Sequence, residues 1–133
     1  MNLKILLVED DEIEKLKFER AIKKLNLSVN ICMAINGEEA LVKCNEETPN
    51  LILLDLNMPK MNGLEFLEHL KSDENLKFIP TVVFSTSNNH QDMLTAFKIG
   101  IAGYVVKPLH YHDYVDQIHK IISYWSINEL VTV

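Results

Sequence analysis

The sequence predicts an α/β fold in which helices cover both faces of a doubly wound, parallel, five-stranded sheet. Short apolar runs with strand character alternate with segments whose apolar residues recur with helical period, and this alternation occurs five times. The run Leu51–Leu54 is wholly aliphatic, as expected of a strand buried on both faces. Strands that alternate with helices in this way are joined by right-handed crossovers, which place helices on both sides of one sheet.

The first half of the chain contains three predicted strands and two predicted helices. The strands are the apolar runs Leu3–Val8, Val29–Ala34 and Leu51–Leu54. The apolar residues of the first helix recur at the positions that form one helix face: Phe18, Ala21, Ile22 and Leu25. The second helix follows Asn36 and ends before Pro49, because proline cannot continue a helix.

The second half contains the remaining two strands and three helices. Asn62 is expected to cap the third helix, with Glu65 three residues later as in a capping box. The strand Thr81–Phe84 is followed by a helix that should end at Gly100. This helix is expected to bury Met93, Leu94 and Phe97. The fifth strand is Gly103–Val106, and the last helix has apolar residues at helical spacing: Tyr111, Tyr114, Val115, Ile118, Ile121, Ile122 and Trp125.

The length and composition predict one domain. A chain of 133 residues with 47% hydrophobic and 24% charged residues can bury one core of ordinary size. We expect the domain to span residues 1–126 and to be followed by a tail, residues 127–133. Four apolar residues lie in this tail, so it is expected to pack on the last helix or to contact a partner: Ile127, Leu130, Val131 and Val133.

The net charge of −6 argues against nucleic acid or an anionic membrane surface as a partner, since both attract clustered Lys and Arg. No secretion signal precedes the first strand, and no apolar stretch is long enough to span a membrane. A cytoplasmic location is therefore expected. Cys32 and Cys44 lie in apolar contexts and are expected to be buried thiols in a reducing compartment.

Polar residues follow four of the five predicted strands. They are Glu9-Asp10, Asp55, Ser85-Thr86 and Lys107. The carboxyl ends of parallel strands meet at one edge of the sheet, where ligands bind in open α/β folds. Three carboxylates gathered there repel one another, so a hard divalent cation such as Mg²⁺ is the natural partner. A carboxylate can also act as a nucleophile toward phosphorus, and the metal and a lysine would then neutralise the phosphoryl oxygens.

These residues, in this order and at these spacings, resemble the receiver domain of two-component response regulators over residues 3–125. The matching features are the acidic pair Glu9-Asp10, the segment Leu54–Pro59 around Asp55, Gly63, the hydroxyl cluster at Ser85 and the pair Lys107-Pro108. The segments 34–41 and 100–104 also resemble family signatures. The resemblance implies a flavodoxin-like receiver fold and a signalling protein that is not an enzyme acting on a separate substrate.

The resemblance also implies roles for the site residues. Asp55 would accept a phosphoryl group from a sensor histidine kinase or a phosphotransfer protein. Mg²⁺ would bind Asp10, Asp55 and the backbone carbonyl of Asn57 directly, with Glu9 acting largely through water. Lys107 would contact the phosphoryl group.

The family also implies a switch. Ser85 and Tyr104 would move in step with phosphorylation, with Thr86 beside the pocket. The signal would pass to a downstream protein, or to a second copy of the chain, through the face formed by the helix before Gly100, the strand Gly103–Val106 and the last helix. The narrower likeness is to stand-alone receivers associated with sensor kinases, including the phytochrome-linked group.

Several alternatives remain open at the level of the sequence. Asp10 or Asp11 can instead cap the first helix, because Asp is a preferred N-cap residue. Either Ser85 or Thr86 can be the dominant switch hydroxyl, and Tyr104 can simply pack in the core.

Two other functions also remain open. The first is an interaction module that keeps the fold without being phosphorylated. The second is a phosphatase with an aspartate nucleophile, but such an enzyme uses a second Asp two residues after the nucleophile, where this chain has Asn57.

Overall fold

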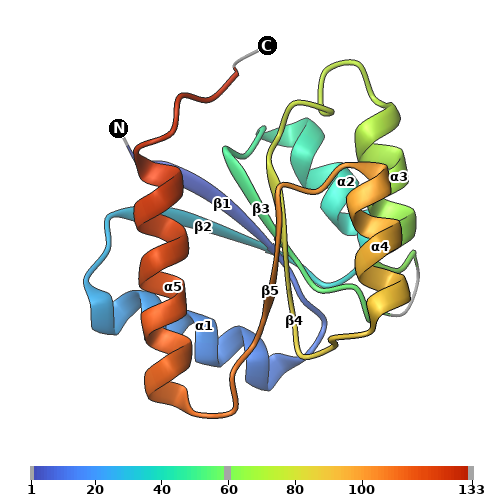
Figure 1. The fold of residues 1–133 in the computed structure, drawn as a ribbon. Helices are drawn as coiled ribbons and strands as arrows, with labels where there is room; N and C mark the ends of the chain where they lie inside the picture. The colour runs from blue at the N-terminus through green and yellow to red at the C-terminus, as the bar shows by residue number, and fades with distance from the viewer. Residues whose placement is uncertain (1, 59–60, 132–133) are drawn as a thin grey trace.

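The computed structural model describes residues 2–58 and 61–131 and contains the predicted parallel sheet (Figure 1). The strand order is β2-β1-β3-β4-β5, and every neighbouring pair is parallel. The strands are β1 (Leu3–Val8), β2 (Val29–Ala34), β3 (Leu51–Leu54), β4 (Thr81–Ser85) and β5 (Gly103–Val106). All five lie where the apolar runs predicted them, and the fourth extends one residue further, to Ser85.

Five helices cover the two faces of the sheet. They are α1 (Glu12–Leu25), α2 (Gly37–Glu46), α3 (Gly63–Ser72), α4 (His90–Ile99) and α5 (Tyr111–Ser126). Helices α1 and α5 pack together on one face, and α2, α3 and α4 pack in a row on the other (Figure 1). The prediction of a doubly wound fold is therefore confirmed.

The side chains of β3 show why the sheet needs two helical layers. All four residues of this strand are fully buried, because β3 is the central strand and has a neighbour on each side. Leu51 and Leu53 belong to the cluster shared with α1 and α5, whereas Ile52 and Leu54 belong to the cluster shared with α2, α3 and α4. Successive strand residues point to opposite faces, so one aliphatic run contributes to both cores.

Side-chain caps begin four of the helices. Asp11, Asn36 and Asn89 each accept a hydrogen bond from a backbone N–H in the first turn of the helix that follows. Asn62 and Glu65 form the predicted capping box of α3, which satisfies two otherwise unpaired N–H groups. Helix α4 ends at Gly100 as predicted, where the φ angle of 131° favours glycine.

The prediction for the buried face of α4 was wrong. Leu94 and Phe97 are 41% and 49% exposed, and Met93 is only partly buried. The buried residue is Ala96, which packs with Ile99 against the core on that side of the sheet. The apolar residues of this short helix lie on more than one face, so their spacing alone did not identify the face that meets the sheet.

The prediction for the cysteines was half right. Cys44 is buried in α2, but Cys32 is exposed, and both thiols are free. Cys32 lies on β2, which is an edge strand whose alternate residues are exposed. A strand at the edge of the sheet has less helix covering it, so an apolar run there does not guarantee burial on both faces.

The tail is largely exposed where the structure describes it. Ile127 and Val131 lie at the surface, whereas Leu130 packs against the α1 and α5 side of the core; residues 132–133 lie outside the described part.

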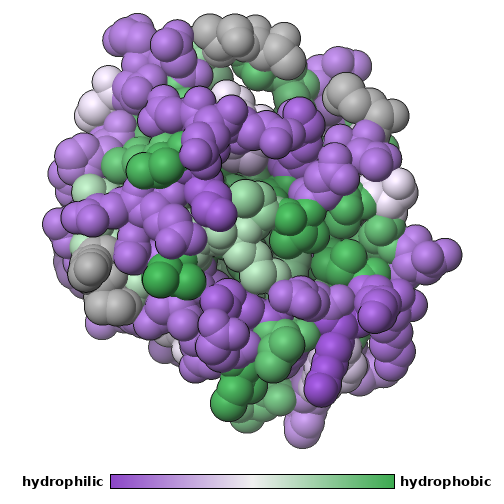
Figure 2. Space-filling view, turned by 180° about the vertical axis from the view of Figure 1, so that it is seen from behind, coloured by the Kyte–Doolittle hydropathy of each residue, from purple (hydrophilic) through white to green (hydrophobic). Residues whose placement is uncertain are grey.

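Seen from behind, an apolar patch lies near the middle of a mostly hydrophilic surface (Figure 2). Within residues 2–58 and 61–131, no helix has both the length and the apolar composition needed to cross a bilayer.

Gly63 begins α3 directly against the backbone that carries Asp55, and this contact leads to a prediction. A Cβ atom at Gly63 would lie 2.6 Å from the carbonyl oxygen of Asp55 and 2.6 Å from Cα of Leu56. Backbone atoms cannot move aside cheaply, so we expect Gly63→Ala to lower the free energy of unfolding by about 1–3 kcal/mol. Urea denaturation measures the change.

Gly103→Ala is the matched control, because a Cβ there would meet only methyl groups of Val82, at 3.9 Å. We expect this control to change the free energy of unfolding by less than about 1 kcal/mol. Equal stability of the two variants would contradict the close contact at Gly63.

Candidate functional site

The carboxyl ends of four strands bring the predicted polar residues to one edge of the sheet. Backbone hydrogen bonds fix these strand ends. The Asp55 N–H donates to the carbonyl of Val8 at 3.0 Å, and the Lys107 N–H donates to the carbonyl of Ser85 at 2.8 Å. The side chains that follow β1, β3, β4 and β5 therefore begin from a rigid frame rather than from free loops.

Glu9, Asp10 and Asp55 form the acidic cluster that the sequence predicts. One carboxylate oxygen from each lies within 4.8 Å of the others. Glu9 is buried, Asp55 is partly buried and Asp10 is exposed, so the cluster opens toward solvent on the Asp10 side. A group of hard oxygen donors with this charge and access matches the ligand preference of Mg²⁺.

Asp11 has a different position from Asp10. Its Oδ1 accepts hydrogen bonds from the N–H groups of Ile13 at 2.8 Å and Glu14 at 3.3 Å, so Asp11 is the N-cap of α1. Of the two aspartates that the sequence left open, Asp10 joins the acidic cluster and Asp11 caps the helix.

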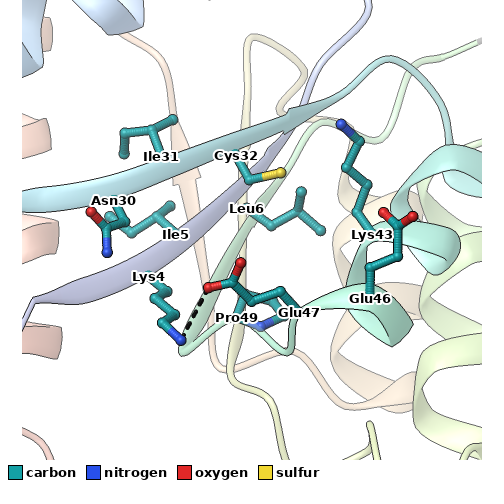
Figure 3. Close-up of a pocket in the computed structure, with 10 residues that line it drawn as sticks. All are labelled: Lys4, Ile5, Leu6, Asn30, Ile31, Cys32, Lys43, Glu46, Glu47 and Pro49. Atoms are coloured by element: carbon teal, nitrogen blue, oxygen red, sulfur yellow. Dashed lines mark ion pairs between the residues drawn. The ribbon is translucent and has the colours of Figure 1, made fainter.

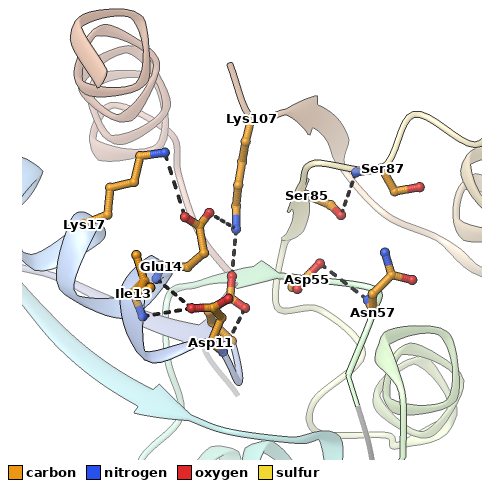
Figure 4. Close-up of polar contacts among 10 residues, drawn as sticks. Asp11, Ile13, Glu14, Lys17, Asp55, Asn57, Ser85, Ser87 and Lys107 are labelled. Atoms are coloured by element: carbon orange, nitrogen blue, oxygen red, sulfur yellow. Dashed lines mark hydrogen bonds and ion pairs between the residues drawn. The ribbon is translucent and has the colours of Figure 1, made fainter. Parts of the chain in front are cut away.

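Lys107 extends from the end of β5 into a buried ion pair (Figure 4). Its Nζ lies 2.7 Å from Oε1 of Glu9 and 3.0 Å from Oε1 of Glu14, and its side chain is only 5% exposed. The sequence pattern predicted Lys107 and Glu9 as site residues but not Glu14. Its place in the sequence could have indicated it, because Glu14 lies in the first turn of the helix that follows the acidic pair, close to the sheet edge.

Burial and pairing shift the ionisation of this group. Burial raises the pKa of the Glu9 carboxyl to about 7, although the Lys107 ammonium beside it acts in the opposite direction. For Lys107, burial favours the neutral amine, but the carboxylates of Glu9 and Glu14 outweigh it and raise the pKa of Lys107 above its usual value. Lys107 is therefore a cation at neutral pH, and the buried Glu9 takes up a proton at a higher pH than an exposed glutamate does.

The predicted hydroxyl residues lie on β4, just after it, and on β5. Ser85 is buried at the end of β4, and its Oγ accepts a hydrogen bond from the N–H of Ser87 at 3.2 Å (Figure 4). Thr86 is exposed. The Tyr104 hydroxyl donates to the carbonyl of Ser87 at 2.8 Å, and its ring packs, half-buried, against the core on the α4 side. Burial raises the pKa of Tyr104 above its ordinary value.

Asn57 lies beside Asp55 in the loop after β3. Its N–H donates to Oδ1 of Asp55 at 3.4 Å, and its side chain is exposed (Figure 4). Pro59, which belongs to the segment that resembles the family, lies outside the described residues.

A hollow lies elsewhere, between β1, β2 and the second half of α2 (Figure 3). It has a volume of about 550 Å³, and an ion pair between Lys4 and Glu47 at 3.1 Å crosses part of it. Its lining contains none of the residues at the carboxyl edge of the sheet. This hollow is therefore separate from the acidic cluster and from Lys107.

The sequence pattern of the response regulator receiver domain matches residues 5–119. The chain is 34% identical over 127 residues to the probable methanogenesis regulatory protein FilR2 of Methanothrix harundinacea, a match that covers 91% of this chain and 82% of that protein. It is 32% identical over 128 residues to the response regulator Rcp1 of Synechocystis, covering 91% and 87% of the two chains.

Solved structures show the same likeness. The phosphorylated cyanobacterial phytochrome response regulator RcpA superposes with a TM-score of 0.90 at 31% identity, covering 99% of this chain and all of that one. The Mn²⁺-bound form of Rcp1 superposes with a TM-score of 0.88 at 30% identity, covering 98% and 99% of the two chains. The chain belongs to the response regulator receiver family, whose members are signalling proteins with an acidic, Mg²⁺-binding pocket.

The buried carboxyl of Glu9 leads to a prediction about pH. A group whose pKa rises from 4.5 in the unfolded chain to about 7 in the folded protein holds its proton more tightly when folded. Its contribution to stability is therefore complete below the unfolded pKa and is lost as the pH rises through the folded one. Glutamine cannot lose a proton, so its stability lacks this dependence on pH. We therefore expect the unfolding free energy of Glu9→Gln, relative to that of the parent, to rise by about 1–3 kcal/mol from pH 5 to pH 8.

Urea denaturation without divalent metal, at both pH values, measures this relative gain. A constant difference between Glu9→Gln and the parent would mean that Lys107 keeps Glu9 ionised throughout the range.

Proposed function

We propose that this receiver domain accepts a phosphoryl group on Asp55 from the phosphohistidine of a sensor kinase or a phosphotransfer protein. The observation that carries the proposal is the acidic cluster of Asp55, Glu9 and Asp10 beside the buried cation Lys107. Acidic residues alone are common at protein surfaces. A buried lysine in the same group supplies the second element that phosphoryl transfer needs, a fixed positive charge.

Mg²⁺ fits the donor set of this site. Asp10, Asp55 and the backbone carbonyl of Asn57 would hold the ion, and Glu9 would act largely through water. The ion would neutralise charge on the phosphoryl oxygens. The Mn²⁺-bound form of Rcp1 supports a divalent cation in this family, since Mn²⁺ prefers the same oxygen ligands.

The transfer itself needs little from the protein beyond positioning and charge. A carboxylate oxygen of Asp55 forms the new O–P bond as the N–P bond of the phosphohistidine breaks, and the electron pair of that bond stays with the imidazole. Lys107 stabilises the phosphoryl oxygens by charge, and the Ser85 hydroxyl donates a hydrogen bond to one of them. Thr86 borders the pocket, and Asn57 and Ser87 shape the approach of the water that later hydrolyses the acyl phosphate.

The proposed switch joins the site to the face formed by α4, β5 and α5. Ser85 moves toward the phosphoryl group, and Tyr104, now held by the carbonyl of Ser87, changes its exposure with it. Apolar side chains that are already exposed on these three elements offer a contact surface for a downstream protein or a second copy of the chain: Leu94, Phe97, Val106 and Tyr124. RcpA, which has a similar structure, has been solved in its phosphorylated form, and this supports phosphorylation of the present chain.

We assign residues 1–126 to the receiver domain and residues 127–133 to a tail, and we place the protein in the cytoplasm with its kinase. Its binding partners in this proposal are proteins, because the net charge of −6 disfavours nucleic acid and anionic membranes.

The mass of the intact protein after incubation with acetyl phosphate tests the proposal. We expect the addition of one phosphoryl group to the parent in the presence of Mg²⁺, and none to Asp55→Asn or to the parent without Mg²⁺. Asp116→Asn is the matched control, because it makes the same chemical change on the exposed side of α5 and should be phosphorylated like the parent.

Beryllofluoride separates the two explanations of a missing adduct. A parent that binds beryllofluoride with Mg²⁺ but shows no added mass hydrolyses its phosphoryl group quickly, in agreement with the proposal. A parent that binds neither reagent is an interaction module that keeps the fold without the reaction, and the proposal is then wrong.

A further inference from the structure

Glu14 contacts the site but has no part in the function proposed above. We propose that Glu14 is a positioning residue that holds Lys107 in its resting place beside Glu9, so that a phosphoryl group on Asp55 must compete with Glu14 for this lysine. The inference rests on the proposed function, because it assigns Lys107 two alternative anionic partners.

The contacts of Lys107 support this competition. Among the residues that the structure describes, its ion-pair partners are Glu9 at 2.7 Å and Glu14 at 3.0 Å, and Asp55 is not one of them. The Lys107 side chain is 5% exposed and that of Glu14 is 21% exposed. Opposite charges attract more strongly at buried and partly buried sites than at the surface, so losing one partner changes the free energy by a measurable amount.

The position of Glu14 is fixed by the start of α1. The Asp11 side chain accepts a hydrogen bond from the backbone N–H of Glu14, which holds the first turn of the helix against the end of β1. The second carboxylate oxygen of Glu14 lies 3.8 Å from Nζ of Lys17, whose ammonium lies 4.4 Å from the centre of the Tyr114 ring on α5. Glu14 is therefore held between two lysines at the interface of α1 and α5.

The arrangement has a consequence for the switch. Two carboxylates hold one ammonium at rest, and a phosphoryl group on Asp55 offers it a third anionic partner. A contact that exists only in the resting arrangement favours that arrangement by its own free energy. Loss of the Glu14 charge should therefore make the phosphoryl-bound arrangement easier to reach, while Glu9 still prevents Lys107 from being left unpaired.

Glu14→Gln removes this charge with little change in shape, and Glu14→Asp keeps the charge. Glu12→Gln is the matched control, because Glu12 lies in the same helical turn but is 79% exposed and pairs with Lys15. The control reports the general effect of removing one negative charge near an anion site. Thermal melting shows that each variant is folded.

The first measurement uses protein without metal. Reductive methylation followed by peptide mass spectrometry reports how accessible the Lys107 amine is. We expect methylation of Lys107 to be faster in Glu14→Gln than in the parent, and to return toward the parent rate in Glu14→Asp. Glu12→Gln should react like the parent.

The second measurement is the affinity for beryllofluoride at saturating Mg²⁺, by calorimetry. We expect Glu14→Gln to bind about three- to tenfold more tightly than the parent, as loss of one partly buried ion pair implies. Glu14→Asp should stay within about twofold of the parent.

Equal affinity in Glu14→Gln and Glu12→Gln, or weaker binding in Glu14→Gln, would overturn the inference and leave the proposed function intact. A parent that binds no beryllofluoride would instead overturn the proposed function, and the inference with it.

Discussion

The buried ion pair between Lys107 and Glu9 is the constraint on which the site depends. It joins residues 98 positions apart, at the ends of β5 and β1, across the two strands that lie between them. Burying either charge without its partner would cost much free energy of folding, so the pair requires both strands to end at the same level. Asp55, at the end of β3, then lies at the same edge as the buried pair of Lys107 and Glu9.

This charge balance accounts for the chemistry that we propose. The ionised carboxylates of Glu9, Asp10 and Asp55 repel one another, and the buried ammonium of Lys107 offsets only part of that repulsion. The site therefore favours additional positive charge, which Mg²⁺ would supply, and a lysine that exchanges one anionic partner for another. In the proposed switch, a cation shared among carboxylates would have two discrete arrangements without a change of fold.

The fold was predictable because each element obeys a local rule. Alternating apolar runs identified the five strands, and Asn62 with Glu65 identified the start of α3. Parallel topology then implied that Glu9, Asp10 and Asp55 meet. Orientation and long-range pairing were not predictable in this way. The buried face of α4 depends on Ala96, and the contact of Glu14 with Lys107 depends on how closely α1 approaches β5. Neither the buried face of α4 nor this contact can be predicted from the spacing of residues within one segment.

The most direct test is a crystal structure of the protein with Mg²⁺ and beryllofluoride. We expect beryllofluoride on the carboxylate of Asp55 and the metal among Asp10, Asp55 and the Asn57 carbonyl. We also expect Nζ of Lys107 to contact a fluorine atom and no longer to contact Glu14. A structure in which Lys107 stays between Glu9 and Glu14 while beryllofluoride occupies Asp55 would contradict the exchange of partners, and beryllofluoride bound at another residue would contradict the assignment of Asp55.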